Sequence, residues 1–190
     1  MAYKVATAPV LEPFTTDYIK TWLKIPSSVT VEDTLLSDLI KNARVWAEQM
    51  TNTAALTQTI EEYFDCWPCG PVLNLTVSPV QSITSVSYFA GGAYTTFDSS
   101  NYYTDLVSTP ARIVLKNSVV FPSTDLGAPN VVKIVYVAGA TAAANVPKTL
   151  MQAMLQKIAY LYENREDIPG ANSNRTRSAD ALAMQNRAFV

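Results

Sequence analysis

The hydrophobic period of the chain changes at Thr57–Phe64, which reads TQTIEEYF. Its side chains fall into two alternating sets, Gln58, Ile60, Glu62 and Phe64 on one face and Thr59, Glu61 and Tyr63 on the other. A two-residue repeat is typical of a β-strand, because successive side chains of a strand point to opposite faces. The residues before this stretch follow helical spacing, so the fold is expected to switch here from helices to strands.

Two helices are predicted before this switch, within an N-terminal helical part spanning residues 1–55. The first covers about 15–24, because Thr15 can cap it and Phe14 can pack onto Ile19 across the first turn. The second covers about 31–50, where Thr30 offers a cap and acidic residues occupy the first turn. Its apolar residues recur at three- and four-residue steps: Leu36, Leu39, Ile40, Ala43, Trp46, Ala47 and Met50.

Short runs rich in β-branched and aromatic residues continue as far as Val137. They lie at 57–64, 72–75, 83–89, 94–97, 102–104, 111–115 and 131–137. Gly91 and Gly92 separate two of the runs, and paired glycines accept the positive φ angles of a hairpin turn. Residues 56–140 are therefore expected to form a β-rich region, either an antiparallel sheet or a small sandwich.

A third helix is predicted over residues 146–167, because Pro147 suits the first helical position and a broad apolar stripe follows it. This helix is expected to pack on the N-terminal helices. Residues 168–190 are rich in Asn, Ser, Arg and Ala and are expected to form an extended C-terminal arm. The predicted fold class is α+β, with helices bracketing an antiparallel, sandwich-like β-rich insertion.

The composition disfavours several classes of function. Hydrophobic residues make up 48% of the chain and charged residues 16%, and the formal net charge is −2, so the basic footprint of a nucleic-acid reader is missing. The sequence has no histidine, which removes the commonest general base and the commonest metal ligand. We therefore expect no enzyme, no cofactor and no metal site. Without a signal peptide or a long apolar segment, we expect synthesis in the cytosol and no membrane association.

The pair Cys66 and Cys69 is the sharpest signal for a different function. Two cysteines three positions apart can form a redox disulfide when they open a helix. Here Gly70-Pro71 leads instead into a β-like run, so a structural loop with free thiols is favoured over a thiol-disulfide oxidoreductase. A structural zinc site would need four ligands, and this pair supplies two.

Three acidic residues, Glu61, Glu62 and Asp65, cluster near one strand end. Adjacent carboxylates can raise one another's pKa and act as an acid/base pair, but neighbours in a strand point to opposite faces. A solvated acidic edge is the favoured interpretation. If the protein lines a DNA passage, such an edge would repel phosphate groups and let DNA slide.

An ordered series of short motifs carries a family resemblance over residues 10–167. The series comprises Glu12-Pro13-Phe14-Thr15, Asp33-Thr34-Leu35-Leu36, Leu56-Thr57-Gln58-Thr59, Pro79 to Val86, Tyr102 with Asp105, Pro110-Ala111-Arg112, Val135 to Gly139, Val146-Pro147 and Leu161 to Glu166. In this order it resembles the head-tail connector (adaptor, or head-completion) proteins of long-tailed phages, prophages and gene transfer agents.

The resemblance implies a structural virion protein of the neck, made in the host cytoplasm. Such proteins assemble as a homo-oligomeric ring, typically a dodecamer, beneath the portal at the capsid vertex. A stopper or tail-completion protein attaches below, and genomic DNA passes through the ring without sequence-specific binding. Another neck or tail-completion ring protein is the alternative within the structural class.

The C-terminal arm is the part that the resemblance implies for portal binding. On position and composition, we expect polar contacts from Arg175, Arg177 and Arg187. Anchoring in portal grooves is expected from Leu182, Met184 and Phe189.

Overall fold

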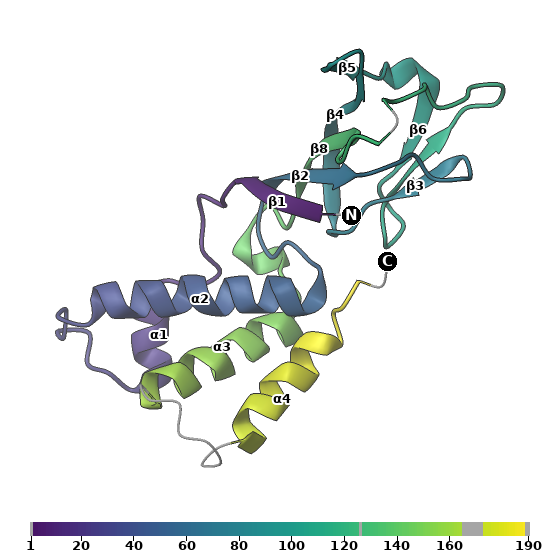
Figure 1. Ribbon diagram of the computed structural model, residues 1–190. Coiled ribbons are helices and arrows are strands. Elements are labelled where there is room, and N and C mark those ends of the chain that lie inside the picture. Colours follow the sequence, from purple (N-terminus) through teal and green to yellow (C-terminus); the bar gives the residue numbers. More distant parts are fainter. Residues whose placement is uncertain (1, 126, 165–172, 189–190) are drawn as a thin grey trace. The chain divides into compact units, whose positions relative to one another are not determined.

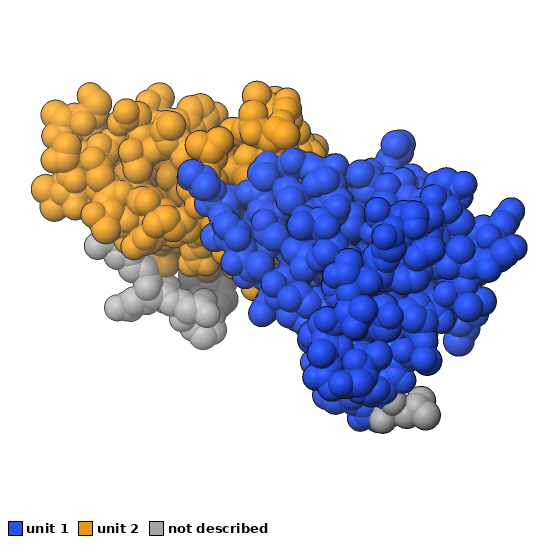
Figure 2. Space-filling view, turned by 90° about the horizontal axis from the view of Figure 1, so that it is seen from above, with its two compact units in different colours: residues 1–10, 57–139, 188–190 blue, residues 11–56, 140–187 orange. Residues whose placement is uncertain are grey.

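The computed structural model describes residues 2–125, 127–164 and 173–188 (Figure 1). The chain forms two compact units (Figure 2), each with its own packing. The strand unit comprises Met1–Val10, Thr57–Gly139 and Ala188–Val190, and the helical unit comprises Leu11–Leu56 and Ala140–Arg187. The mixture of helices with antiparallel sheets confirms the α+β fold class.

The elements follow the sequence expectations closely in the middle of the chain. The helical unit contains α1 (Thr16–Leu23), α2 (Asp33–Thr51), the short 3-10 helix η2 (Ala143–Asn145), α3 (Lys148–Glu163) and α4 (Ser173–Met184). The strand unit contains β1 (Ala2–Thr7), β2 (Gln58–Phe64), β3 (Val72–Asn74), β4 (Val80–Ala90), β5 (Ala93–Thr96), the 3-10 helix η1 (Ser99–Asn101), β6 (Tyr102–Asp105), β7 (Arg112–Leu115) and β8 (Val132–Ala138).

The structure confirms the N-terminal cap predicted for the first helix but not the one predicted for the second. The Tyr18 amide donates to the Thr15 hydroxyl at 3.2 Å, which confirms the predicted cap of α1. The predicted Thr30 cap of α2 is wrong, because Glu32 occupies the N-cap position. The Glu32 carboxylate accepts a hydrogen bond from the Tyr162 hydroxyl at 2.7 Å, which ties the start of α2 to α3.

Antiparallel pairing organises the strand unit into two sheets. The larger sheet has the order β1-β2-β8-β4-β5 and the smaller one the order β3-β7-β6. Strand β8 lies at the centre of the larger sheet, where Gln58 pairs with Ala138 and Phe64 with Val132. Burial alternates along β2 and β8, so one face of this sheet is packed on the core.

The glycine pair forms the predicted hairpin turn between β4 and β5. Gly91 and Gly92 have φ angles of 61° and 82°, a region that residues with a Cβ rarely adopt. Their amides donate to the two carboxylate oxygens of Asp125 at 3.1 and 3.2 Å. The acceptor therefore comes from a loop 34 and 33 residues further along the chain.

Strand β1 is an element that hydrophobic patterning did not reveal. All six of its residues are exposed, and it pairs with β2 at one end of the strand order. Lys4 makes an ion pair of 3.0 Å with Glu61 on β2. An exposed edge strand has no buried face to impose a period, which explains why its sequence carried no signal.

One hydrophobic core holds the helical unit together. It draws on every helix of the unit from α1 to α4, with α3 packed against both α2 and α4 (Figure 1). Its fully buried members are chiefly Ile19, Leu36, Ala43, Leu150, Met154 and Ile158. The stripes predicted for the second and third helices therefore meet in a single core.

The C-terminal segment corrects the expectation of an extended arm. Residues Ser173–Met184 form helix α4, which packs on α3 through Ala183, a fully buried member of the core. Ala179 is buried as well. Alanine has the highest intrinsic helix propensity and allows close approach between helices, so a segment with a weak apolar stripe still docks on its neighbour.

A buried charge fixes the N-terminal segment onto α2. The Arg44 side chain is 8% exposed and reaches Glu12 at 2.8 Å and Glu48 at 2.9 Å. Glu48 also accepts a hydrogen bond from the Ala55 amide at 3.0 Å. Burial raises the pKa of Glu48, and the opposing attraction of Arg44 lowers it. The Arg44–Glu48 pair thus links the segment at Glu12, helix α2 and the residues after α2 at Ala55.

We predict that Arg44→Ala lowers the free energy of unfolding by about 3 kcal/mol, because it leaves Glu48 buried without its cation. The matched control is Lys41→Ala on the same helix, which removes an exposed pair with Asp38 and should cost less than about 1 kcal/mol. Urea denaturation followed by circular dichroism measures both. Equal losses in the two variants would contradict the role given to Arg44.

Candidate functional site

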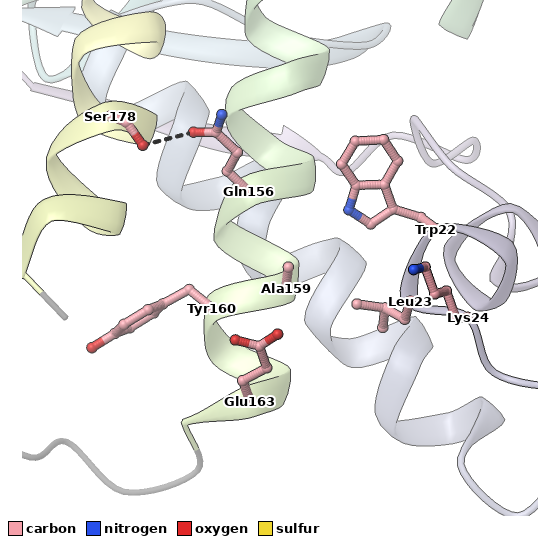
Figure 3. Close-up of a pocket in the computed structure, with 8 residues that line it drawn as sticks. All are labelled: Trp22, Leu23, Lys24, Gln156, Ala159, Tyr160, Glu163 and Ser178. Carbon is pink, nitrogen blue, oxygen red and sulfur yellow. Dashed lines mark hydrogen bonds between the residues drawn. The ribbon is translucent and has the colours of Figure 1, made fainter. Parts of the chain in front are cut away.

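A pocket of about 580 Å³ opens on the surface of the helical unit (Figure 3). The end of α1, the outer face of α3 and α4 supply its walls. Its lining residues are Trp22, Leu23, Lys24, Gln156, Ala159, Tyr160, Glu163 and Ser178. The Ser178 hydroxyl donates to the Gln156 side-chain oxygen at 3.1 Å, so this part of the wall is held by a contact between α4 and α3.

The chemistry of the pocket suits binding better than catalysis. Trp22 is 43% exposed and offers an aromatic wall, while Lys24 and Glu163 supply one charge of each sign. Lys157 lies beside the pocket on α3, with its ammonium 5.8 Å from the Tyr160 ring centre. Among the lining residues, the Ser178 hydroxyl donates to the neutral Gln156 side chain rather than to a carboxylate or amine base.

The residues expected to bind a portal lie in and after α4. Arg177, Met184 and Arg187 are exposed, whereas Leu182 is partly buried against the helical core. Helix α4 therefore uses Leu182 internally and presents Arg177 and Met184, while Arg187 is exposed in the segment after the helix. The side chain of Arg175, and all of Phe189, lie outside the described residues.

Glu61 is held by charges and a hydrogen bond on the surface of the strand unit. The Tyr63 hydroxyl donates to Glu61 at 2.7 Å, and Lys4 and Lys133 lie 3.0 and 3.5 Å away. The hydrogen bond from Tyr63, then that from Lys4, lowers the pKa of Glu61 to about 2. Asp65 is exposed and accepts a hydrogen bond from the Asn130 amide at 2.8 Å.

Glu62 corrects the expectation of a solvated acidic edge, because its side chain is fully buried. The Thr76 amide donates to both carboxylate oxygens, at 3.2 and 3.1 Å, and the Thr76 hydroxyl donates to one of them. The Tyr136 hydroxyl donates to the other at 2.8 Å. Burial raises the pKa of Glu62, and the hydrogen bonds from Thr76 and Tyr136 oppose that rise.

Glu62 and Tyr136 therefore form a core network that sequence reasoning missed. Burial and the neighbouring Glu62 carboxylate both raise the pKa of Tyr136. The Tyr136 hydroxyl also accepts a hydrogen bond from the Val77 amide at 3.3 Å. The alternation of β2 put Glu62 on the face of Ile60, and this was the available signal that Glu62 is buried while Glu61 is not.

The cysteine pair lies in a loop between two strands. Cys66 and Cys69 are both exposed and free, and the chain runs from β2 through this loop into β3. A low-pKa redox cysteine usually stands at the N-terminus of a helix, which this loop does not provide. The setting therefore gives no support to a thiol-disulfide oxidoreductase.

The described part of the chain contains neither a cluster of metal ligands nor a membrane-spanning helix. Within residues 2–125, 127–164 and 173–188, no three side chains of His, Cys, Asp or Glu gather as a metal site would require. None of the helices in these ranges combines the length and apolar character needed to cross a bilayer.

Comparisons with known proteins give a likeness in structure. No family model and no curated protein matches the sequence. A chain from the neck of an empty gene transfer agent (GTA) particle, computed with C6 symmetry, matches with a TM-score of 0.83 at 22% identity. A chain from the virion of a native GTA particle matches with a TM-score of 0.79 at 20% identity. A chain from the neck of a native GTA particle, computed with C12 symmetry, matches with a TM-score of 0.77 at 20% identity. Each match covers 100% of this chain and 97% of the other, so the fold is shared over its whole length.

We predict opposite pH dependence from the two neighbouring glutamates. Burial raises the pKa of Glu62 above its ordinary 4.5, so the folded protein holds this proton more tightly than the unfolded chain does. The contribution of Glu62 to stability is therefore complete below pH 4.5 and is lost as the pH rises through the raised pKa. Relative to Glu62→Gln, the wild type should lose free energy of unfolding as the pH rises. The slope should approach about 1.4 kcal/mol per pH unit between pH 4.5 and the raised pKa.

The matched control is Glu61→Gln, one residue away on the same strand. Glu61 has a lowered pKa, so its contribution is present above pH 4.5 and is lost as the pH falls towards about 2. Urea denaturation of the wild type, Glu62→Gln and Glu61→Gln, at pH values below and above 4.5, measures how the free energy of unfolding of each variant differs from that of the wild type. Parallel stability curves for wild type and Glu62→Gln would contradict the buried position of Glu62.

Proposed function

We propose that this chain is a structural component of the neck of a phage-like particle, and specifically a head-tail connector of the adaptor type. The observation that carries the proposal is the match to GTA neck chains over 100% of this chain with TM-scores up to 0.83. The protein would act by assembly and would catalyse no reaction. Its place would be the particle neck, after synthesis in the host cytoplasm.

Ring assembly is supported by the symmetry of the similar particles and by the surface of the helical unit. The neck chains come from assemblies computed with C6 and C12 symmetry. A ring needs two different surfaces that meet head to tail, and exposed aromatic residues are common at such interfaces. Tyr18 and Trp22 lie one turn apart on α1 and are 50% and 43% exposed. We propose a homo-oligomeric ring of twelve copies.

The portal contact is proposed to involve α4 and the residues that follow it. Arg177 and Arg187 would make polar contacts, and Met184 would supply an apolar one, since all three are exposed. Arg175 and Phe189 remain expected members of this surface. Leu182 is reassigned to holding α4 on its own helical core, because it is partly buried there.

The other end of the ring is proposed to bind a stopper or tail-completion protein, with genomic DNA passing through the centre. Glu61 and Asp65 stay candidates for an acidic surface toward DNA, and Glu62 is removed from that set by its burial. The ion pairs of Glu61 with Lys4 and Lys133 offset much of its charge, which leaves Asp65 as the stronger candidate.

Electron microscopy of the purified chain mixed with the particle's own portal tests the proposed function. We expect an added ring on the outer end of the portal. The alternative, another neck or tail-completion ring, predicts binding to the tail tube in a parallel pull-down and no added density on the portal. Density on neither partner would contradict both structural assignments.

We predict that Arg177→Glu combined with Met184→Ala weakens portal binding at least tenfold, or about 1.4 kcal/mol, because the first reverses a charge and the second removes an apolar contact. Lys116→Glu in the strand unit is the charge-matched control and should bind as the wild type does. Surface plasmon resonance on immobilised portal measures the affinities. Unchanged affinity in the double variant would overturn the proposal that α4 binds the portal. The proposal that the protein forms a ring on the portal would still be tested by the electron microscopy.

A further inference from the structure

The loop over residues 65–71 carries one thiol on each side of a partly buried centre, Trp67-Pro68. Trp67 and Pro68 are partly buried, whereas Cys66 before them and Cys69 after them are exposed. The pattern places the middle of the loop against the strand unit. The two sulfur-bearing side chains stay accessible to small molecules in solution.

Aromatic packing holds this centre in place. The Trp67 ring stacks on Phe121, with ring centres 4.3 Å apart and planes inclined by 11°, and it meets the buried Phe97 at 6.0 Å. Aromatic pairs of this kind stabilise the fold by more than the apolar area that they bury. The loop cannot move far at its centre without giving up these contacts.

Hydrogen bonds hold both ends of the loop. At its first residue, the Asp65 side chain accepts a hydrogen bond from the Asn130 amide at 2.8 Å. At its last residue, the Pro71 carbonyl accepts one from the Leu115 amide at 2.9 Å. Only Trp67 and Pro68 separate the two cysteines along the chain. Because so short a linker gives each thiol a high effective concentration at the other, reaction within the chain is favoured over reaction between chains.

We propose that Cys66 and Cys69 are a modification site that closes to an intrachain disulfide when the protein meets an oxidising small-molecule disulfide. The reaction occurs once per chain and involves no turnover. The dithiol form belongs to the reducing cytosol and the disulfide form to the environment outside the cell. This timing rests on the proposed function, whereas the chemistry rests on the loop alone.

The oxidation is a two-electron thiol-disulfide exchange in two steps. The thiolate of one cysteine attacks the small disulfide, forms a mixed disulfide and releases one small thiolate. The thiolate of the other cysteine then attacks the protein sulfur of that mixed disulfide and releases the second small thiolate. The protein loses two electrons and two protons, and the small disulfide is reduced to two thiols.

The disulfide would close a short covalent ring that contains the backbone of Trp67 and Pro68. The unfolded chain loses more freedom from this link than the pinned native loop does, so the folded state gains stability. We expect the unfolding midpoint of the oxidised chain to lie about 2–4 °C above that of the reduced chain. Dithiothreitol should reverse the shift.

The test uses the purified full chain with oxidised glutathione. We expect both titratable thiols to disappear, the monomer mass to fall by two hydrogen atoms, and no covalent dimer on a non-reducing gel. The single variants Cys66→Ser and Cys69→Ser are matched controls. Each should keep one bound glutathione, because the resolving thiol is missing.

Two results would overturn the proposal. Stable glutathione adducts on both cysteines of the wild type would mean that the thiols cannot reach one another. Covalent dimers or ladders would mean that the pair reacts between chains. Neither result touches the portal-binding experiment, so failure here is distinguishable from failure of the proposed function.

Discussion

The pairing of β2 with β8 is the constraint on which the rest of the structure depends. Gln58 lies opposite Ala138, so the strand that opens the β-rich region lies beside the strand that closes it. In the helical unit, Leu56 bridges Ala140, whose amide donates to the Ala55 carbonyl at 3.3 Å. Because the chain leaves and re-enters the helical unit at adjacent residues, α2 and α3 can share one core despite the long insertion between them.

The same pairing explains how a carboxylate is accommodated in the strand unit. Glu62 lies opposite Ile134, and Ile60 lies opposite Tyr136, so Tyr136 is the diagonal neighbour of Glu62 on the buried face. This register brings the tyrosine hydroxyl within 2.8 Å of the carboxylate. A buried acid without such donors would cost several kcal/mol, so the register and the acid depend on one another.

The sequence predicted the elements whose buried face carries large apolar residues, and it missed β1 and α4. The exposed strand β5 was predicted from its β-branched and aromatic residues and from the glycine turn before it. The stripe from Leu36 to Met50 and the alternation of β2 were visible because burial imposes their periods. β1 is exposed along its length, and α4 docks chiefly through two alanines and the partly buried Leu182, so neither carries a strong period. The surroundings of Glu62 were beyond reach because its donors, Thr76 and Tyr136, lie 14 and 74 residues away in the sequence. The pocket beside Trp22 likewise depends on three helices meeting.

The closeness of Leu56 and Ala140 gives the chain a modular build. A segment whose two ends meet can lengthen, shorten or be exchanged while the elements on either side keep their places. β1 would have to change along with such a segment, because it pairs with β2. Over evolutionary time, the strand unit can therefore diverge in length and loop content at a different rate from the helical core.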